Sequence, residues 1–525
     1  MTELQIQKQS KNWMFYAAVL LAAVYLETSI YHHVLPDLEK LIDILQWYAL
    51  ILALLAIVYL IFIVSRNLPK GQRKDYFLRR FGSYEQMYLI FVFFWYIVTV
   101  ALRQYLEGGN RFKTNDLWMF ITGMVAFLYG PFARYSGAEK AKKTIECLLH
   151  LLIVPYAIFV AWVIWNYFHL NFVTFPSGRQ LQLEAPAILH YTGVNHVSIG
   201  RQAFVMLGLS LYMIITQKPL VKILYSLDFA VFFAFLVLTN VRTSWYMASA
   251  MMACAAFVFC WNRLEKRRAI QRTAVGILLA VAVAVSCHLL RDGVFLLLKN
   301  AWAAENRTVE ITASAETKLA PGQTARQLQT LSCRGAEVSM PSPKMQQLET
   351  EVSAAEEDDS TDYKRTIGNN MFSFEERIRL YRASLFVMFT SRYRFLFGVT
   401  PADVVPTLRG VYGVSKTFPY GHAHNFFLQM GVAFGVPTMI ATIVFAGSLL
   451  VRSIRVIFIN RKKLFSGAWM ICLMVLFFLA ADMFESGLNA SPDFFCPAFY
   501  LLAGWLVALD MDTRAPKKNG KHAWF

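Results

Sequence analysis

The chain has 525 residues, of which 57% are hydrophobic and only 16% are charged. Soluble globular domains carry about 25% charged residues, so this composition argues against an ordinary soluble fold. The formal net charge is +17, but the basic residues lie mostly in short segments between apolar runs. That distribution indicates orientation in a bilayer and argues against nucleic-acid binding.

Apolar runs of about 20 residues recur along the chain, which is the length that a helix needs to cross a bilayer. Their residues are apolar throughout and do not alternate with polar ones, so the pattern excludes a membrane β-barrel. We therefore predict an all-α, polytopic membrane helical bundle of about twelve transmembrane helices. The predicted spans are 13–35, 44–64, 86–102, 116–133, 147–168, 201–216, 220–239, 243–261, 273–298, 424–450, 466–482 and 494–510.

The positions of lysine and arginine predict how the bundle is oriented. These residues are concentrated in alternate connections, at 66–80, 134–143, 218–222, 263–272 and 452–463, and in the tail at 511–525. The remaining short loops contain few of them. The dense set should face the cytoplasm by the positive-inside rule. Both termini then lie in the cytoplasm, which agrees with an even number of spans.

Composition divides the chain into four parts. Residues 1–299 hold the first nine spans, 300–421 form a large extracytoplasmic loop, 422–510 hold the last three spans, and 511–525 form a basic cytoplasmic tail. Within the loop, residues 304–362 are too poor in apolar side chains to offset chain entropy, so we expect disorder there. Residues 372–397 carry apolar side chains at helical spacing, interleaved with arginines. They predict an amphipathic helix on the membrane surface or over the bundle.

Three residues predicted to lie at the outer membrane face carry groups suited to chemistry. Arg242 follows the seventh span, Arg377 lies near the start of the amphipathic helix, and His424 opens the tenth span. Arginine binds phosphate oxygens through a planar fork of donors and stays charged at any relevant pH. Histidine can take or give a proton near neutrality. Together they indicate a site for a pyrophosphate-linked lipid.

Each charged candidate also has a structural interpretation. Arg242 is compatible with a side chain that extends to the membrane interface from a helix end, and Arg377 with one solvated charge among several. Asp482 and Glu485, at the end of the eleventh span, are compatible with a general base or with ion pairing to an arginine. Pairing is the safer expectation, because an isolated carboxylate at a membrane boundary is costly.

The histidines and their neighbour allow further alternatives. His422 and His424 are two residues apart, so on a helix they would point to different sides. No cysteine or carboxylate lies near them in sequence, and the seven cysteines form no CxxC pair. We therefore expect no metal and no cofactor at this site. His424 is also compatible with a helix cap, a role that suits Asn425 better because asparagine is a favoured N-cap residue.

The segment that begins at His424 resembles the ligase pattern of the O-antigen ligase and O-antigen polymerase superfamily. That pattern is His, then Asn, Ser or Gln, nine residues, and Gly-x-x followed by Gly, Thr or Tyr. Here it reads His424-Asn425, the nine residues 426–434, and Gly435-Val436-Pro437-Thr438. The match is complete, with threonine in the last place.

Four other segments are similar to the same superfamily, with departures. Arg377 falls on the arginine of the family's periplasmic helix, although Glu375-Glu376 replaces Ser-Gly. Phe397-Gly398-Val399 matches the following motif, but Thr400 stands where a second glycine is usual. Asn240-Val241-Arg242 resembles a Ser-x-Ser-Arg segment with valine in place of the second serine. Phe484-Glu485 resembles a pair found late in the family.

The resemblance implies a metal-independent, inverting glycosyltransferase in the bacterial cytoplasmic membrane, with an extracytoplasmic active site. It implies a glycan donor on undecaprenyl pyrophosphate and a sugar hydroxyl as acceptor, on lipid A core or another surface glycan or glycolipid. Arg242 and Arg377 would neutralise the departing pyrophosphate, and His424 would activate the acceptor. The additional candidates for substrate binding are His422, Asn425, Arg379, Arg382 and Glu485.

The sequence leaves the reaction open in two ways. A ligase transfers the glycan to lipid A core or another surface acceptor, whereas a polymerase transfers it to the next lipid-linked repeat. The sequence does not separate the two: the His-Asn pattern leans towards a ligase, but looser versions of it occur among polymerases. A flippase for lipid-linked sugars is an alternative of another class, as is a membrane scaffold. A transporter would require charged residues at mid-depth in the spans and internal repeats. Glu27 and Asp228 stand isolated in their spans and no repeat is evident, which argues against transport.

Overall fold

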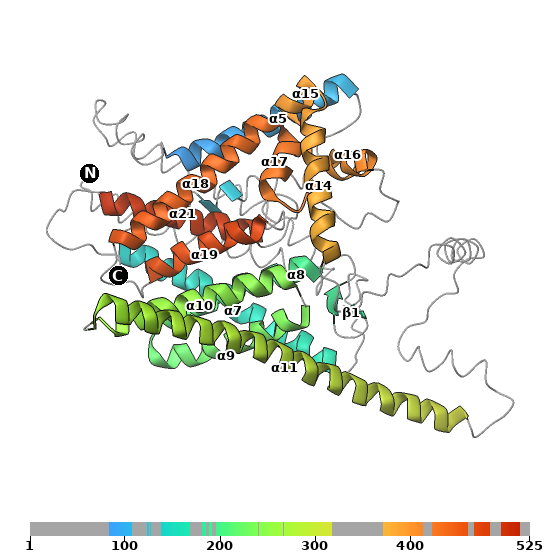
Figure 1. Ribbon diagram of the computed structural model, residues 1–525, viewed down its shortest axis with the longest axis vertical. Coiled ribbons are helices and arrows are strands. Elements are labelled where there is room, and N and C mark those ends of the chain that lie inside the picture. The colour runs from blue at the N-terminus through green and yellow to red at the C-terminus, as the bar shows by residue number, and fades with distance from the viewer. Residues whose placement is uncertain are drawn as a thin grey trace. The chain divides into compact units, whose positions relative to one another are not determined.

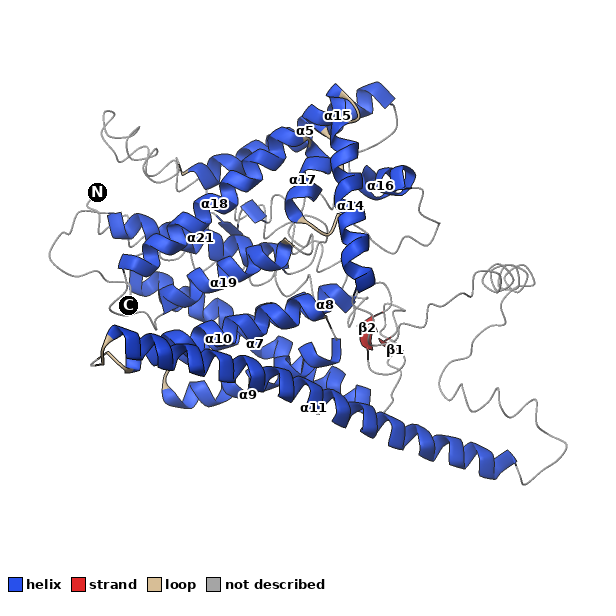
Figure 2. Cartoon of the chain, in the orientation of Figure 1, coloured by secondary structure: helices blue, strands red, loops and turns tan. Residues whose placement is uncertain are grey.

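The computed structural model describes residues 83–107, 123–124, 126–127, 138–168, 181–184, 188–191, 196–239, 241–265, 267–317, 371–412, 423–459, 467–483 and 495–514. These residues are predominantly helical (Figure 2). The exception is an antiparallel hairpin of β1 (Leu181–Glu184) and β2 (Ile188–Tyr191), in the loop predicted between the fifth and sixth spans. Its first strand reads Leu-Gln-Leu-Glu, an apolar–polar alternation that is typical of strands and that the all-α prediction did not use.

The helices of the predicted membrane region include five that are long and apolar enough, among the described residues, to cross a bilayer. They lie in α5 (Tyr84–Glu107), α9 (Pro219–Thr239), α10 (Arg242–Arg263), α11 (Ala269–Thr317) and α18 (Val436–Ile459). Shorter apolar segments lie in α7 (Ala138–Phe168), α8 (His196–Thr216), α19 (Gly467–Asp482) and α21 (Phe495–Arg514). The count of twelve stays a prediction, because spans 13–35 and 44–64 lie outside the described residues.

The chain forms two compact units. One consists of residues 1–298 and 380–525, and the other of residues 299–379. α11 begins in the first unit and ends in the second, and it continues as a helix to Thr317, into the segment where composition predicts disorder. The remainder of that segment, from residue 318 on, lies outside the described residues.

The predicted amphipathic helix over 372–397 is two helices. α14 (Met371–Phe389) ends before Ser391, whose side chain accepts a hydrogen bond from the Arg394 amide and caps α15 (Arg392–Phe397). α15 ends at Gly398, which adopts φ +69° as its C-cap, as the glycine predicted. A short 3₁₀ turn (Pro401–Asp403) and α16 (Val404–Tyr412) follow.

The predicted tenth span, 424–450, is likewise broken. α17 (Phe426–Phe434) has nine residues and stops at Gly435, and α18 runs on from Val436 to Ile459. Figure 1 shows α17 as a short separate helix and α18 beside α5. α18 therefore extends beyond Arg452 and Arg455, which the sequence analysis assigned to a cytoplasmic loop.

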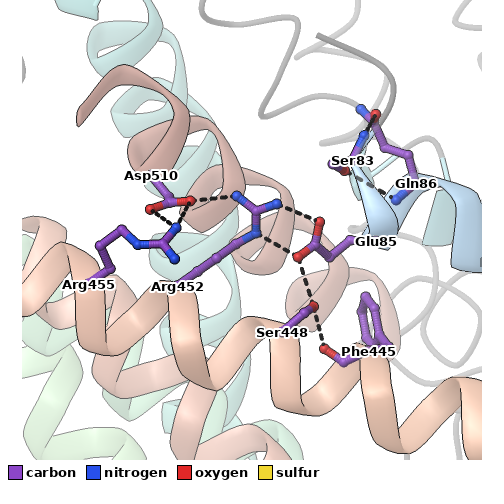
Figure 3. A network of polar contacts seen from close by, with 8 residues as sticks. All are labelled: Ser83, Glu85, Gln86, Phe445, Ser448, Arg452, Arg455 and Asp510. Carbon is purple, nitrogen blue, oxygen red and sulfur yellow. Dashed lines mark hydrogen bonds and ion pairs between the residues drawn. The ribbon is translucent and has the colours of Figure 1, made fainter. Parts of the chain in front are cut away.

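Those two arginines belong to an ion cluster that joins α5, α18 and α21 (Figure 3), in which Arg452 is largely buried and Arg455 keeps 37% of its side chain exposed. Arg452 donates to both oxygens of Glu85 at 2.6 and 2.9 Å and to Asp510 at 2.6 Å, while Arg455 donates to both oxygens of Asp510 at 3.1 Å. The Ser448 hydroxyl donates to Glu85 at 2.7 Å. Both carboxylates are fully buried. Two positive and two negative groups balance each other, which makes their burial tolerable.

Candidate active site

His424 lies immediately before the first turn of α17 and is buried, with 6% of its surface exposed. Its backbone adopts φ +50°, a left-handed conformation that is uncommon for residues other than glycine. Asn425 is the N-cap of α17, and its Oδ1 accepts a hydrogen bond from the Leu428 amide at 3.0 Å. This confirms the prediction that Asn425 is the capping residue. It also leaves the imidazole of His424 outside the capping interaction.

Hydrogen bonds hold the turn around His424 on three sides. The Tyr381 hydroxyl, from α14, donates to the carbonyl of His424 at 3.0 Å. Asn425 Nδ2 donates to the carbonyl of Met483, the residue that follows α19, at 3.0 Å. The buried Gln429 accepts from the amide of Ala423 at 2.9 Å. The turn is therefore joined to α14, to α19 and to the helix that it precedes.

The other end of α17 is held by main-chain and indole donors. The amides of Val399 and Thr400 donate to the carbonyls of Val432 and Ala433 at 2.8 and 2.9 Å. The indole of Trp95, on α5, donates to the carbonyl of Phe434 at 2.9 Å. A helix leaves its last carbonyls without partners inside the helix, so these donors satisfy groups that would otherwise be buried and unpaired.

Two glycines permit this close packing. Gly435 has φ +91°, and a β-carbon there would lie 2.2 Å from the carbonyl oxygen of Leu396. Gly398 has φ +69°, and its β-carbon would lie 2.5 Å from the backbone of Ala433. Each glycine belongs to a segment that resembles the family motifs. Both positions require glycine for a steric reason. The backbones of the two segments are in contact there, and any side chain would separate α15 from α17.

Arg103 holds the segment 399–403, whose main chain bonds to the end of α17. It is buried near the end of α5, and its Nη1 donates to the carbonyl of Val399 at 2.7 Å and pairs with Asp403 at 3.3 Å. Asp403 also accepts from the hydroxyl of Thr400 at 2.8 Å. Thr400, where the family usually has glycine, adopts φ +76°. The hydroxyl bond to Asp403 holds threonine in a conformation that favours glycine.

Arg242 is the first residue of α10 and is exposed, while Val241 before it is buried. A β-carbon on Gly200, in the first turns of α8, would contact Val241. α8 and α19 run antiparallel, since Phe204 packs on Phe478 and Gly208 lies against Met474. The start of α10 and the last turn of α19 are therefore at the same end of the bundle.

Asn425 bonds to the residue that follows α19, so Arg242 and His424 share that end. The structure does not place the other predicted site residues relative to His424 in the same way. Arg377 is partly buried and Arg379 exposed, and both belong to the second unit, so their relation to His424 stays a prediction. Arg382 is exposed on α14.

Asp482 is fully buried at the end of α19. His422, Glu485 and Glu27 lie outside the described residues. Asp228, which appeared isolated in its span, is buried in α9, and its Oδ2 has no hydrogen-bond partner among the described residues.

Sequence reasoning missed several residues near this end. Tyr381 appeared as one apolar position of an amphipathic pattern, and its contact with His424 had no signal in the sequence. Arg291 lies inside the predicted span 273–298, with its guanidinium 5.9 Å from the ring of Trp245, one turn after Arg242. Arg201 is buried next to Gly200. A charged residue within or beside an apolar run was the signal available for both arginines.

Comparison with known protein families gives a match over part of the chain. The model of the O-antigen ligase family matches residues 227–443, from within α9 to the first half of α18. The matched segment contains Arg242, Arg377, His424 and Gly435, while Arg103 and Trp95 lie before it. No curated protein matches the chain. The family match supports the resemblance that the motifs carry.

Proposed function

We propose, on the premise that residues 227–443 form a domain of the O-antigen ligase and polymerase superfamily, that this protein is a membrane glycosyltransferase. Its donor is a glycan carried on undecaprenyl pyrophosphate, and its acceptor is a sugar hydroxyl of lipid A core or another surface glycolipid. It works at the outer face of the bacterial cytoplasmic membrane, with both termini in the cytoplasm. The reaction needs no metal.

The chemistry is a direct displacement at the anomeric carbon. The acceptor oxygen attacks that carbon while its proton passes to the imidazole of His424. The bond from the anomeric carbon to the pyrophosphate oxygen breaks, and undecaprenyl pyrophosphate departs with the electron pair. Arg242 and Arg377 stabilise the charge that develops on the pyrophosphate. Attack from the side opposite the leaving group inverts the anomeric centre.

One observation supports this proposal most strongly. A buried histidine in a left-handed turn opens a short helix that is fixed at both ends, and Arg242 lies at the same end of the bundle. Strained backbone that persists under such restraint is often found at functional sites. The helix itself is part of the segment that matches the O-antigen ligase family.

The direct test is glycan transfer by the purified protein in lipid nanodiscs, with a lipid-linked oligosaccharide as donor. We expect His424→Ala to lower the turnover rate by about 10²–10⁴-fold, the usual contribution of a general base. Arg242→Ala and Arg377→Ala should each cost about 10²–10³-fold, as the loss of an electrostatic stabiliser does. Arg392→Ala removes an exposed arginine of α15 and serves as the matched control. Near-normal turnover by His424→Ala would exclude His424 as the base.

Two variations of the assay address the alternatives. Supplying either lipid A core or a second lipid-linked repeat as the acceptor distinguishes a ligase from a repeat-unit polymerase of the same superfamily. The buried carboxylate of Asp228 is the feature that favours a transporter of lipid-linked sugars. For this test the protein is reconstituted in liposomes. Movement of labelled donor across the liposome membrane, without any transfer product, would favour a transporter over a transferase.

A further inference from the structure

We propose that Tyr381 is a positioning residue, whose hydroxyl fixes the backbone of His424 and thereby the direction of its imidazole. This inference rests on the proposed function, in which His424 acts on the acceptor hydroxyl. Tyr381 is partly buried in α14, and its hydroxyl lies 3.0 Å from the carbonyl oxygen of His424. The same hydroxyl lies 3.5 Å from the carbonyl oxygen of Met483. A single phenol therefore connects three separate segments at the start of α17.

The conformation of His424 gives this contact its importance. A left-handed backbone costs a residue with a β-carbon about 1–2 kcal/mol, and at φ +50° His424 adopts it. Such a conformation persists where the surroundings fix the peptide groups on either side. Gln429 holds the amide of Ala423, and Asn425 is held by Met483. Tyr381 holds the carbonyl of His424 between these two points.

The direction of the His424 side chain follows from this restraint. The φ and ψ angles of a residue determine where its Cα–Cβ bond points, and side-chain rotamers are limited by the same backbone. If the His424 carbonyl loses its donor, the peptide group that it shares with Asn425 is freer to rotate, and the imidazole turns with it. Displacement of a catalytic group by about 1 Å can cost about 10²-fold in rate.

Helical spacing alone does not distinguish Tyr381 from a residue that only packs against the bundle. On α14, Leu380, Ala383, Ser384, Val387 and Met388 are buried in the bundle, so an apolar tyrosine beside them is compatible with packing. The phenol ring serves that packing, and phenylalanine would serve it equally. The hydroxyl alone makes the bond to His424, so its removal separates positioning from packing.

The test is Tyr381→Phe, with Tyr84→Phe as a matched control. Tyr84 also donates a hydrogen bond of 3.0 Å to a main-chain carbonyl, that of Ala441, but this bond joins α5 to α18. Each variant removes a phenol hydroxyl that donates to the main chain: Tyr381→Phe loses the bonds to His424 and Met483, and Tyr84→Phe loses the bond to Ala441. We expect Tyr381→Phe to lower kcat about tenfold to a hundredfold while KM for the donor changes by less than about twofold, because binding is retained and orientation is lost. Tyr84→Phe should keep both constants.

A second measurement is independent of activity. Hydrogen exchange at the amides of residues 424–428 should be faster in Tyr381→Phe than in wild type, and unchanged in Tyr84→Phe. If Tyr381→Phe matches Tyr84→Phe in kcat and in exchange while His424→Ala still abolishes transfer, the positioning role is wrong and the proposed function stands. If the wild-type protein shows no transfer, the proposed function is wrong, and exchange then tests only whether the Tyr381 hydroxyl restrains the backbone of His424; unchanged exchange overturns that restraint as well.

Discussion

Replacement of Gly435 by alanine tests whether the break between α17 and α18 is a steric requirement. At φ +91° and ψ 167°, this residue lies in a region that is nearly exclusive to glycine, and alanine there costs about 1–3 kcal/mol. The new β-carbon would also lie 2.2 Å from the carbonyl oxygen of Leu396 and 2.8 Å from that of Phe395. Because these atoms belong to the backbone, no side-chain rotation relieves the overlap, and such overpacking costs about 1–3 kcal/mol more.

We therefore expect Gly435→Ala to destabilise the protein by about 2–6 kcal/mol. The assay is thermal and denaturant unfolding in detergent micelles, followed by intrinsic fluorescence. Gly447→Ala is the matched control, since this glycine lies within α18 and a β-carbon there meets nothing within 4 Å. Alanine in that helix interior should stabilise by about 0.5–1 kcal/mol. Equal unfolding midpoints for the two variants would refute the steric argument.

Three further substitutions test the contacts that hold the bundle and the site. Glu85→Gln leaves the buried guanidinium of Arg452 without its full counter-charge and should cost about 2–4 kcal/mol in unfolding free energy; an unchanged midpoint would show that the cluster contributes nothing net. Arg103→Met removes the donor that holds the segment before α16 and should lower the free energy of unfolding by about 1–3 kcal/mol. The double variant Arg103→Met with Asp403→Asn should lose less than the sum of the two single variants, because the two side chains interact. Asn425→Asp keeps the cap acceptor but loses the donor to α19, so turnover should fall while the helix content measured by circular dichroism is retained; retained turnover would show that this link is dispensable.

The broad architecture was readable from the sequence because it depends on local properties. Runs of apolar residues predicted the helices of the bundle, Gly398 predicted the end of α15, and Asn425 predicted the cap of α17. The break at Gly435 was missed because hydropathy responds to apolar side chains, and every neighbour of that glycine is apolar. Pro437, in the first turn of α18, was an available signal for a new helix start, since proline favours such positions.

The contacts that organise the site could not be read in the same way. Arg103 meets Asp403 across 300 positions of sequence, and Tyr381 meets His424 across 43. No spacing rule connects residues so far apart without an alignment of relatives. Arg452 was placed in a cytoplasmic loop because positive charge near a span end predicts orientation. Its actual partners, Glu85 and Asp510, lie on helices whose pairing the sequence does not specify.

The ion cluster has a consequence for how the chain is assembled during synthesis. Asp510, on α21, is translated after Arg452 and Arg455 of α18, and Glu85 balances only one of these two arginines. Until Asp510 arrives, α18 carries an excess positive charge that is costly away from water. The last described helix thus supplies a charge that an earlier helix needs, and a chain that ended before Asp510 would leave one of these two arginines of α18 without its counter-charge.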